Sequence, residues 1–474
     1  MTEAQITALG PALATFLDRF LFCCGYTQTF AHLGAYCRGL LSNLERKTAE
    51  PIALAAGIPV RTLQEFLTDH VWDHNKVRDL LQQHVGATLA TLPDDDLGTV
   101  GIVDETGTAK KGIKTPGIQR QWCGELGKTD NCIVTVHLGV AHGRYKTLVD
   151  RDLFLPKSWS MDRNRCRAAG IPDQVVHRPK WQMALEQIDH AKTNGLVPDW
   201  LTFDEGYGDC PAFLLEVDRR GLPFVGEVPR SLRCFAARQP LASSSSWAED
   251  LVRHSPTFTQ QPWQRFSLSR QTLGEQIWLV KTGLVRLSVK QQPSAKTYRL
   301  IWARNERTGE EKYFLSNASE ETPLELQVRV AFSRWNVEHA IRLSKSELGF
   351  RHFEGQNYVA LLRHLTLCLL MQVFVASRTE GLRKKNPEVT QEQVCFGLKR
   401  LCWRWLGRMR GSTDRCYDET VVQYHQKRNR AARLSRQRRQ SDLPAEYEHT
   451  RRGSRKSKPG RSRIGCSRQL FKPP

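Results

Sequence analysis

The sequence predicts a mixed α/β protein with a helical N-terminal region and a β-rich insertion, and three patterns support this class. Residues 1–95 carry apolar side chains at helical spacing, as in "PALATFLDRFLFCC". Residues 96–230 alternate short β-rich runs with an amphipathic stretch, which is typical of a mixed sheet covered by helices. Residues 231–320 are irregular and rich in β-forming side chains. Since the chain has 474 residues, we expect several domains rather than one core.

The part of the chain after the predicted insertion divides into three segments. Helical spacing returns over 321–375, as in "LELQVRVAFSRWNVEHAIRLSKSELGF", and again over 376–425. The last segment, 426–474, contains basic clusters such as "RQRRQ" and few apolar residues. Such a composition predicts a disordered basic tail.

A helix-turn-helix is predicted at residues 52–67 of the N-terminal region, which is therefore a candidate DNA-binding domain. A short helix over 52–56 meets a turn at "GIP", and a second helix follows. Three apolar residues at i, i+3 and i+4 spacing form its buried face: Leu63, Phe66 and Leu67. Arg61 and Gln64 lie on its open face, where they could read DNA bases. The alternative is an ordinary packed helical hairpin.

The charge and cysteine content favour a nucleic-acid partner inside the cell. The formal net charge is +21 and the isoelectric point about 9.6, as expected for a protein that binds a polyanion. No apolar run approaches the length of a membrane span, and the N-terminus lacks the pattern of a signal peptide. The 13 cysteines include no C-x-x-C pair, which indicates reduced thiols in a cytoplasmic protein and argues against zinc.

Carboxylates recur at positions suited to a shared site. Asp104 closes the apolar run "GIVD", and Asp204 closes "LTFD". Since ligands of open α/β sheets bind at strand ends, we expect both side chains in one site. After the insertion, Arg334, Glu338 and Lys345 are spaced i, i+4 and i+11, so a helix places them on one face.

This pattern suits metal-dependent phosphoryl transfer. Three carboxylates can hold two Mg²⁺ ions, which prefer oxygen ligands. Two such ions can promote an in-line displacement at phosphorus. Lys110 and Lys111 follow Asp104 closely, where a phosphate backbone could pass. Taken singly, a strand-terminal Asp is more often a turn residue, and an Arg-x3-Glu pair is more often a surface ion pair.

Several blocks, in order, resemble the DDE transposases of bacterial insertion sequences over residues 15–375. Arg334, Glu338 and Lys345 fit the Y-(2)-R-(3)-E-(6)-K signature, although Ala331 stands at the Tyr position. "GIVDETGTAKKG" and "FDEGYGD" resemble the first and second Asp motifs. The resemblance implies a ribonuclease-H-like mixed sheet core, formed by 96–230 and 321–375 and interrupted by the β-rich insertion.

The resemblance also implies roles for individual residues. Asp104, Asp204 and Glu338 are expected to be the catalytic, metal-binding triad for two Mg²⁺ ions, with Mn²⁺ as a substitute. Arg334 and Lys345 are expected to contact DNA phosphates. The partners implied are terminal inverted repeats and target DNA, a second copy of the chain in a homodimeric synapse, and the nucleoid when DNA is bound. Neighbouring strand residues face opposite ways, and helical spacing places Glu347 on the side of the helix opposite Glu338. Four carboxylates within the motifs are therefore not expected to be ligands: Glu105, Glu205, Asp209 and Glu347.

Two other functions remain open on the sequence alone. A domesticated DNA-binding regulator would keep the basic charge and the helix-turn-helix, but it would not need three carboxylates. A ribonuclease-H-like nuclease would cut DNA without strand transfer. Nucleotide binding at "LGKT" is rejected, because Trp122 stands where a phosphate loop needs its first glycine.

Overall fold

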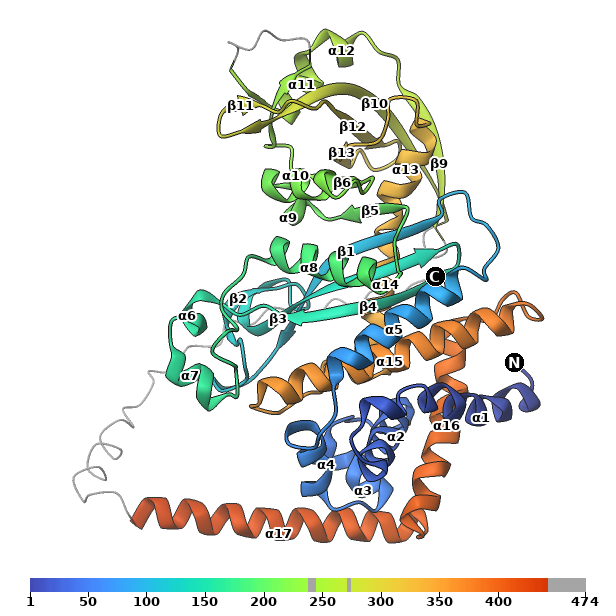
Figure 1. Ribbon diagram of the computed structural model, residues 1–474, viewed down its shortest axis with the longest axis vertical. Coiled ribbons are helices and arrows are strands. Elements are labelled where there is room, and N and C mark those ends of the chain that lie inside the picture. The colour runs from blue at the N-terminus through green and yellow to red at the C-terminus, as the bar shows by residue number, and fades with distance from the viewer. Residues whose placement is uncertain (238–243, 271–273, 442–474) are drawn as a thin grey trace, which may run out of the picture. The chain divides into compact units, whose positions relative to one another are not determined.

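The computed structural model describes residues 1–237, 244–270 and 274–441, which fall into two compact units (Figure 1). The first unit, Met1–Ser412, contains the N-terminal helices, two sheets and the helices that follow them. The second begins at Thr413 and is described as far as Ser441.

The N-terminal region is helical, as predicted. Its helices are α1 (Glu3–Asp18), the 3-10 turn η1 (Leu21–Cys23), α2 (Thr27–Leu41), α3 (Ala49–Ala56), α4 (Val60–Thr68) and α5 (His74–Leu89). Helix α3 begins earlier than expected, because Pro51 is tolerated in a first helical turn. Gly57 then takes a left-handed conformation (φ 69°) and ends α3, and α4 buries the three predicted apolar residues. Arg61 and Gln64 are exposed.

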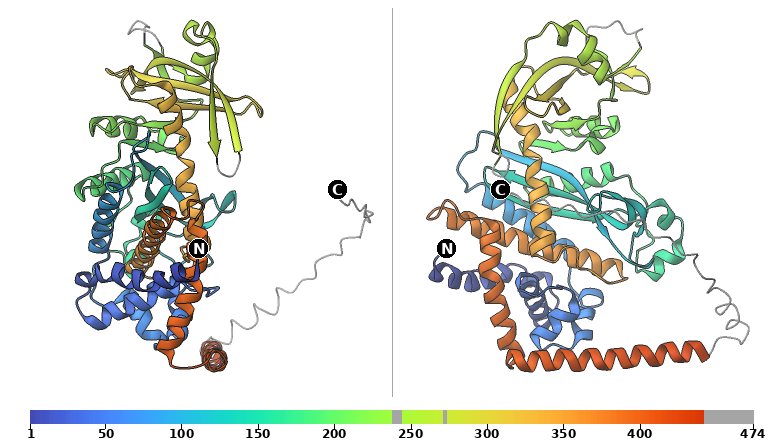
Figure 2. Two further views of the ribbon diagram at one scale, coloured as in Figure 1. Left: turned by 90° about the vertical axis from the view of Figure 1, so that its right-hand side faces the viewer. Right: turned by 180° about the vertical axis from the view of Figure 1, so that it is seen from behind.

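Helix α15 (Tyr358–Arg383) crosses beneath the first sheet and joins it to the N-terminal helices (Figure 2). By length and composition α15 could span a membrane. The prediction that no apolar run approaches this length missed it, because charged and polar residues interrupt the run. However, 94% of its apolar window is buried inside the protein, so α15 is a core helix. Arg363 donates hydrogen bonds from α15 to main-chain carbonyls at and beyond the end of α4.

The first sheet has five strands: β1 (Thr99–Ala109), β2 (Gln119–Cys123), β3 (Lys128–His142), β4 (Tyr145–Leu153) and β5 (Trp200–Phe203). Strand β1 pairs antiparallel with β3 and parallel with β5. On the side of β3 away from β1, β2 pairs with the first part of β3 and β4 with the second part. Five helices belong to this part: α6 (Lys157–Ser160), α7 (Arg163–Ala168), α8 (Lys180–Thr193), α9 (Glu205–Gly208) and α10 (Pro211–Arg219). The mixed α/β class is therefore confirmed.

The second sheet has eight strands: β6 (Val225–Val228), β7 (Arg233–Ala236), β8 (Ser246–Trp247), β9 (Gln264–Arg270), β10 (Gly274–Val289), β11 (Gln292–Pro293), β12 (Tyr298–Asn305) and β13 (Glu311–Ser316). Helices α11 (Ala248–His254) and α12 (Pro256–Thr259) lie between its strands in sequence. Strand β6 had been predicted to belong to the first sheet. It instead forms its ladder with β13, and only Phe224 bridges to β5.

The helical stretch after the second sheet is two helices rather than the one expected: α13 (Leu324–Ser333) and α14 (Trp335–Glu347). They meet at Arg334, whose carbonyl accepts from Val337 in a tighter turn than an α-helix makes. Helix α13 contacts β5 and β6, whereas α14 contacts β1, β3 and β4 (Figures 1 and 2). The pair therefore carries Glu338 to the first sheet.

Of the two C-terminal segments, 376–425 contains the helices that were expected, whereas the start of 426–474 differs from its prediction. Helix α16 (Gln391–Arg410) packs on α1, α2 and α3. Helix α17 (Asp414–Ser441) then covers residues 426–441, which composition had assigned to a disordered tail. Alanine and arginine in this stretch are good helix formers, so charge alone does not prevent a helix. The rest of the predicted tail, 442–474, lies outside the described residues.

Candidate active site

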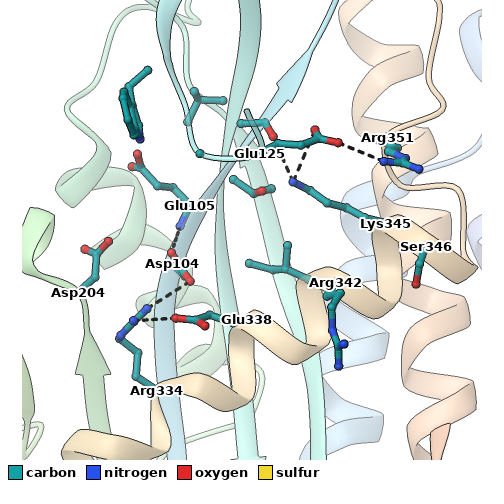
Figure 3. Close-up of a pocket in the computed structure, with 16 residues that line it drawn as sticks. Asp104, Glu105, Glu125, Asp204, Arg334, Glu338, Arg342, Lys345, Ser346 and Arg351 are labelled. Atoms are coloured by element: carbon teal, nitrogen blue, oxygen red, sulfur yellow. Dashed lines mark hydrogen bonds and ion pairs between the residues drawn. The ribbon is translucent and has the colours of Figure 1, made fainter. Parts of the chain in front are cut away.

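The three predicted carboxylates line one cavity of about 640 Å³ (Figure 3). Asp104 lies in the middle of β1, not at its end as predicted, because β3 continues the pairing as far as Ala109. Asp204 directly follows β5 and caps the short helix α9 by accepting from the amide of Tyr207. Since Val103 pairs with Phe203, the next residue of each strand brings the two aspartates side by side. Glu338 enters from α14.

Arg334 is the positive charge among these carboxylates. Its Nη2 lies 2.7 Å from Glu338 Oε1, and its Nη1 lies 3.7 Å from Asp104 Oδ2. Its Nε lies 3.9 Å from Oε2 of Glu227, on β6. Although burial opposes the charged form, these carboxylates raise the pKa of Arg334 above its ordinary value.

The two aspartates carry unfavourable charge. Burial and then the charge of Asp204 raise the pKa of Asp104 to about 7, although Arg334 opposes the rise. Burial also raises the pKa of Asp204, against Arg334 and the amides of Tyr207 and Gly206. One guanidinium therefore does not balance the carboxylates that surround it.

The carboxylate oxygens of the pocket are of the chemical type that binds a divalent metal, although the side chains are too far apart to coordinate one ion in this arrangement. In the described ranges, no three His, Cys, Asp or Glu side chains are close enough to hold an ion as they stand. Carboxylate oxygens are hard ligands, and their mutual repulsion is relieved by a divalent cation. Asp104, Asp204 and Glu338 are thus the side chains that would hold one, with Arg334 as the competing cation.

The three lysines predicted to contact DNA lie in different surroundings. Lys345 lines the pocket, where its Nζ donates to the carbonyl of Gly107 and lies 3.8 Å from Glu125. Lys110 is used within the fold: its Nζ donates to the carbonyls of Arg351, at 2.9 Å, and Phe353. Its burial lowers its pKa to about 8.

Lys111 is exposed to solvent, so the two adjacent lysines have different surroundings. Main-chain acceptors in the segment that follows α14 explain the difference, and no pattern in the sequence indicates them. Lys111 is therefore the better placed of the two for a phosphate.

The pocket also contains residues that the sequence reading missed. Arg342 lies one turn after Glu338 and is exposed, and helical spacing from Glu338 could have found it (Figure 3). Glu125 holds Arg351 at 3.2 Å. Trp122 lines the pocket with 63% of its surface exposed. No sequence signal marks these last two as pocket residues, because only the pairing of β2 with β3 brings them there.

The carboxylates next to the predicted triad in sequence lie in different places. Glu105 lines the pocket, contrary to expectation (Figure 3). Its carboxylate forms an ion pair with Lys180 of α8. Glu205 is exposed, and Glu347 pairs with Lys399 of α16 at 2.7 Å, away from the pocket. Glu347 thus lies on the other side of α14 from Glu338, as the spacing predicted.

Residues 19–278 match the family model of the DDE superfamily endonucleases, and the chain belongs to this family. The mixed sheet that carries Asp104 and Asp204 is accordingly a ribonuclease-H-like core, and enzymes of the superfamily use divalent metal ions.

A curated relative makes the class more specific. The chain is 28% identical over 363 residues to a protein of Microchaete diplosiphon described as "Probable transposase for insertion sequence element IS701". The alignment covers 74% of this chain and 84% of the relative. The family and this relative together support a DNA transposase of an insertion sequence and do not favour a regulator without catalytic activity.

Proposed function

We propose that Asp104, Asp204 and Glu338 are the catalytic triad that cuts the ends of the insertion sequence and joins them to target DNA. One observation carries this proposal: three carboxylates from two adjacent strands and one helix line a single pocket around one guanidinium. The family match ends at residue 278, so the choice of Glu338 rests on this geometry and on its spacing from Arg334 and Lys345.

The proposed metals are two Mg²⁺ ions, for which Mn²⁺ can substitute. Bound at these carboxylates, they would activate the attacking oxygen and stabilise the leaving oxygen of an in-line displacement. The protein's own part is to keep Asp104 and Asp204 fixed on paired strands and to hold Glu338 through α14. Arg334 and Lys345 line the same pocket, where they can neutralise the oxygens of the reacting phosphate.

The proposed reaction has two steps at this one site. In the first, water attacks a phosphodiester at the element's end; the P–O3′ bond breaks, and a 3′-hydroxyl and a 5′-phosphate are released. In the second, that hydroxyl attacks a phosphodiester of target DNA and displaces a new 3′-hydroxyl. Both steps are transfers at phosphorus with oxygen nucleophiles, so the same carboxylates and cations serve both.

The remaining regions are proposed to bind DNA and a second subunit. Helices α3 and α4 form a DNA-binding domain that recognises the terminal inverted repeat through Arg61 and Gln64, both exposed on α4. Lys111 contacts the backbone near the pocket. The basic segment 426–474 adds non-specific attraction, and two subunits hold two ends in a synapse. We infer a cytoplasmic protein that associates with the nucleoid through this DNA.

The test of the triad is substitution with isosteric amides. Asp104→Asn, Asp204→Asn and Glu338→Gln should each abolish cleavage and strand transfer, because a neutral amide is a poor ligand for Mg²⁺. The measurement is cleavage of a labelled element end with Mg²⁺, beside a gel shift on the same DNA. Binding should persist, since substitution removes negative charge near the phosphates.

Two carboxylates provide matched controls for this test. Glu347→Gln changes the same helix on its other side, and Glu205→Gln changes the residue next to Asp204. Both variants should keep most of their activity. Near-normal cleavage by folded Glu338→Gln would disprove the assignment of the third carboxylate.

A further inference from the structure

A second groove lies across helix α14 from the catalytic pocket. Its cavity measures about 480 Å³, and its walls come from the β3–β4 turn, β9, α13, α14 and the start of α16. Helix α14 contributes Trp335 and His339 to this groove, but Glu338 and Arg342 to the catalytic pocket. The two cavities are therefore separated by one helix, about 10 Å wide.

The groove is lined by four lysine and arginine side chains and by two carboxylates, Glu325 and Glu392. Two of them have carboxylate partners, Arg329 with Asp96 and Arg383 with Glu380, and the His339 ring lies 3.0 Å from Glu392. The other two, Arg144 and Lys146, form no ion pair within the described part of the chain. Among residues that the structure describes, the Arg144 guanidinium donates to the main-chain carbonyl of Pro387 and to no carboxylate, so its charge is available to an anion.

Lys146 is held in place without an anion. Its Nζ lies 5.1 Å from the ring centroid of Trp335, a cation–π contact that fixes the ammonium against the groove wall. Burial lowers the pKa of Lys146 to about 8; Glu392 opposes this, and Arg383, Arg342 and Arg144 add to it. A half-buried ammonium among three guanidinium groups is a favourable place for a phosphate, which would relieve their repulsion.

Arg342 connects the groove to the catalytic pocket. It lines the pocket, is exposed to solvent, and lies about two turns along α14 from Trp335, whose ring the Lys146 ammonium contacts. Arg342, Lys146 and Arg144 thus form a series of cations that leads from the reacting centre over α14 into the groove.

We propose that Arg144 and Lys146 bind a backbone phosphate of DNA, so that the DNA crosses helix α14 between the catalytic pocket and this groove. This inference rests on the proposed function, because it takes the reacting phosphate to lie at the triad. The phosphate belongs to DNA on either side of the reaction, namely the sequence flanking the element or the target. Both sources offer the same phosphodiester chemistry.

The first test measures how binding depends on salt, using the full chain and a random-sequence duplex that needs no knowledge of the repeat. Each phosphate contact contributes about −0.9 to the slope of log K against log salt concentration. Lys146→Gln and Arg144→Gln should each reduce the steepness by about 0.9. Lys192→Gln, an exposed lysine of α8 outside the groove, is the matched control and should leave the slope unchanged.

A conservative variant separates phosphate binding from a structural role. Lys146→Arg keeps the charge and the contact with Trp335, so it should restore the wild-type slope. A slope unchanged by Lys146→Gln and Arg144→Gln would overturn the proposal. A general loss of affinity with an unchanged slope, accompanied by a lower melting temperature, would also overturn it.

The second test identifies the source of the DNA and separates this inference from the proposed function. Lys146→Gln is assayed on an uncut element end with flanking sequence, on a pre-cut end, and in strand transfer to a plasmid. A defect confined to the uncut end assigns the groove to the flank, and a defect confined to strand transfer assigns it to target DNA. If triad variants lose cleavage but the groove variants bind and react normally, the inference fails while the proposed function stands.

Discussion

A buried arginine, Arg363, and a half-buried one, Arg334, use the same guanidinium group for opposite purposes in two regions of the protein. Arg363 joins α15 to the N-terminal helices by donating to four main-chain carbonyls, and its plane lies over Trp72. Arg334 lies in the catalytic pocket among three carboxylates, at distances from 2.7 to 3.9 Å. The partners of Arg363 are main-chain carbonyls, which the backbone holds in place. The partners of Arg334 are carboxylates, which can bind a metal ion or a proton in place of the guanidinium.

This difference shows which buried charges maintain the fold and which are available for chemistry. Carbonyls cannot leave a helix end without unfolding it, so Arg363 is part of the structure. The carboxylates around Arg334 repel one another, as the raised pKa of Asp104 indicates. A region with unbalanced charge loses stability but can bind ions and phosphates.

The largest expected effect separates these two arginines. Arg363→Met keeps the side-chain stem but leaves buried carbonyls without donors, so unfolding should become easier by about 3–5 kcal/mol. Arg334→Gln should instead reduce cleavage by about 100-fold or more, because a cation next to the reacting phosphate is lost. Thermal or denaturant unfolding and cleavage of a labelled end, measured on both variants, provide the comparison.

Each arginine serves as the control for the other. Folded Arg363→Met should cleave normally per folded molecule, and Arg334→Gln should lose little stability because Asp104 can take up a proton instead. If Arg334→Gln unfolds as easily as Arg363→Met, the distinction between the two regions is wrong.

A smaller effect concerns how much the ionised Asp104 side chain destabilises the folded protein. Its folded pKa of about 7 exceeds the unfolded value of about 3.9, so the folded state binds more protons between these values. Stability should therefore fall as pH rises from about 4 to 7 and stay low above that range. In a chelator at pH 8, Asp104→Asn should be more stable than wild type by up to about 4 kcal/mol.

The control for this prediction is pH itself. Near pH 4 the aspartate is protonated in the folded state and about half protonated in the unfolded state, so the difference between Asp104→Asn and wild type should nearly vanish. Denaturant titrations at the two pH values measure it. An equal difference at both would mean that packing, rather than charge, accounts for the gain.

The smallest effect asks whether the N-terminal region also carries function. Arg61 and Gln64 are exposed on α4, and Arg61 forms only a surface ion pair with Glu65. Replacing either with Ala should weaken binding to the element's end by about 1–3 kcal/mol, with much less effect on random DNA. Stability should hardly change, since both side chains are on the surface.

Competition gel shifts with the two DNAs measure this specificity. Thr68→Ala, a substitution on the last turn of the same helix, is a control that should leave the ratio of affinities near that of wild type. Equal losses on the element's end and on random DNA would show that Arg61 and Gln64 contact phosphates rather than bases.

Local patterns in the sequence were sufficient for several features of the fold and the candidate site. Apolar spacing located the buried face of α4, and the signature spacing placed Glu338 and Arg334 on one helical face. These features depend on residues within a few turns or one strand, so the order of side chains contains the information. The resemblance of ordered motifs to a family added the link between carboxylates far apart in the chain.

Only the tertiary structure decided which long-range partners each residue meets. The register of β1 on β5 brings Asp104 beside Asp204, and strand β3 extends β1 beyond the predicted end. Carbonyls from a segment more than two hundred residues away accept hydrogen bonds from Lys110, whereas Lys111 is exposed to solvent. The sequence by itself determined the residue types and their local faces, whereas pairing, burial and the resulting pKa values arise from contacts between distant segments. Those contacts depend on how whole elements pack, and no local pattern of residues records that packing.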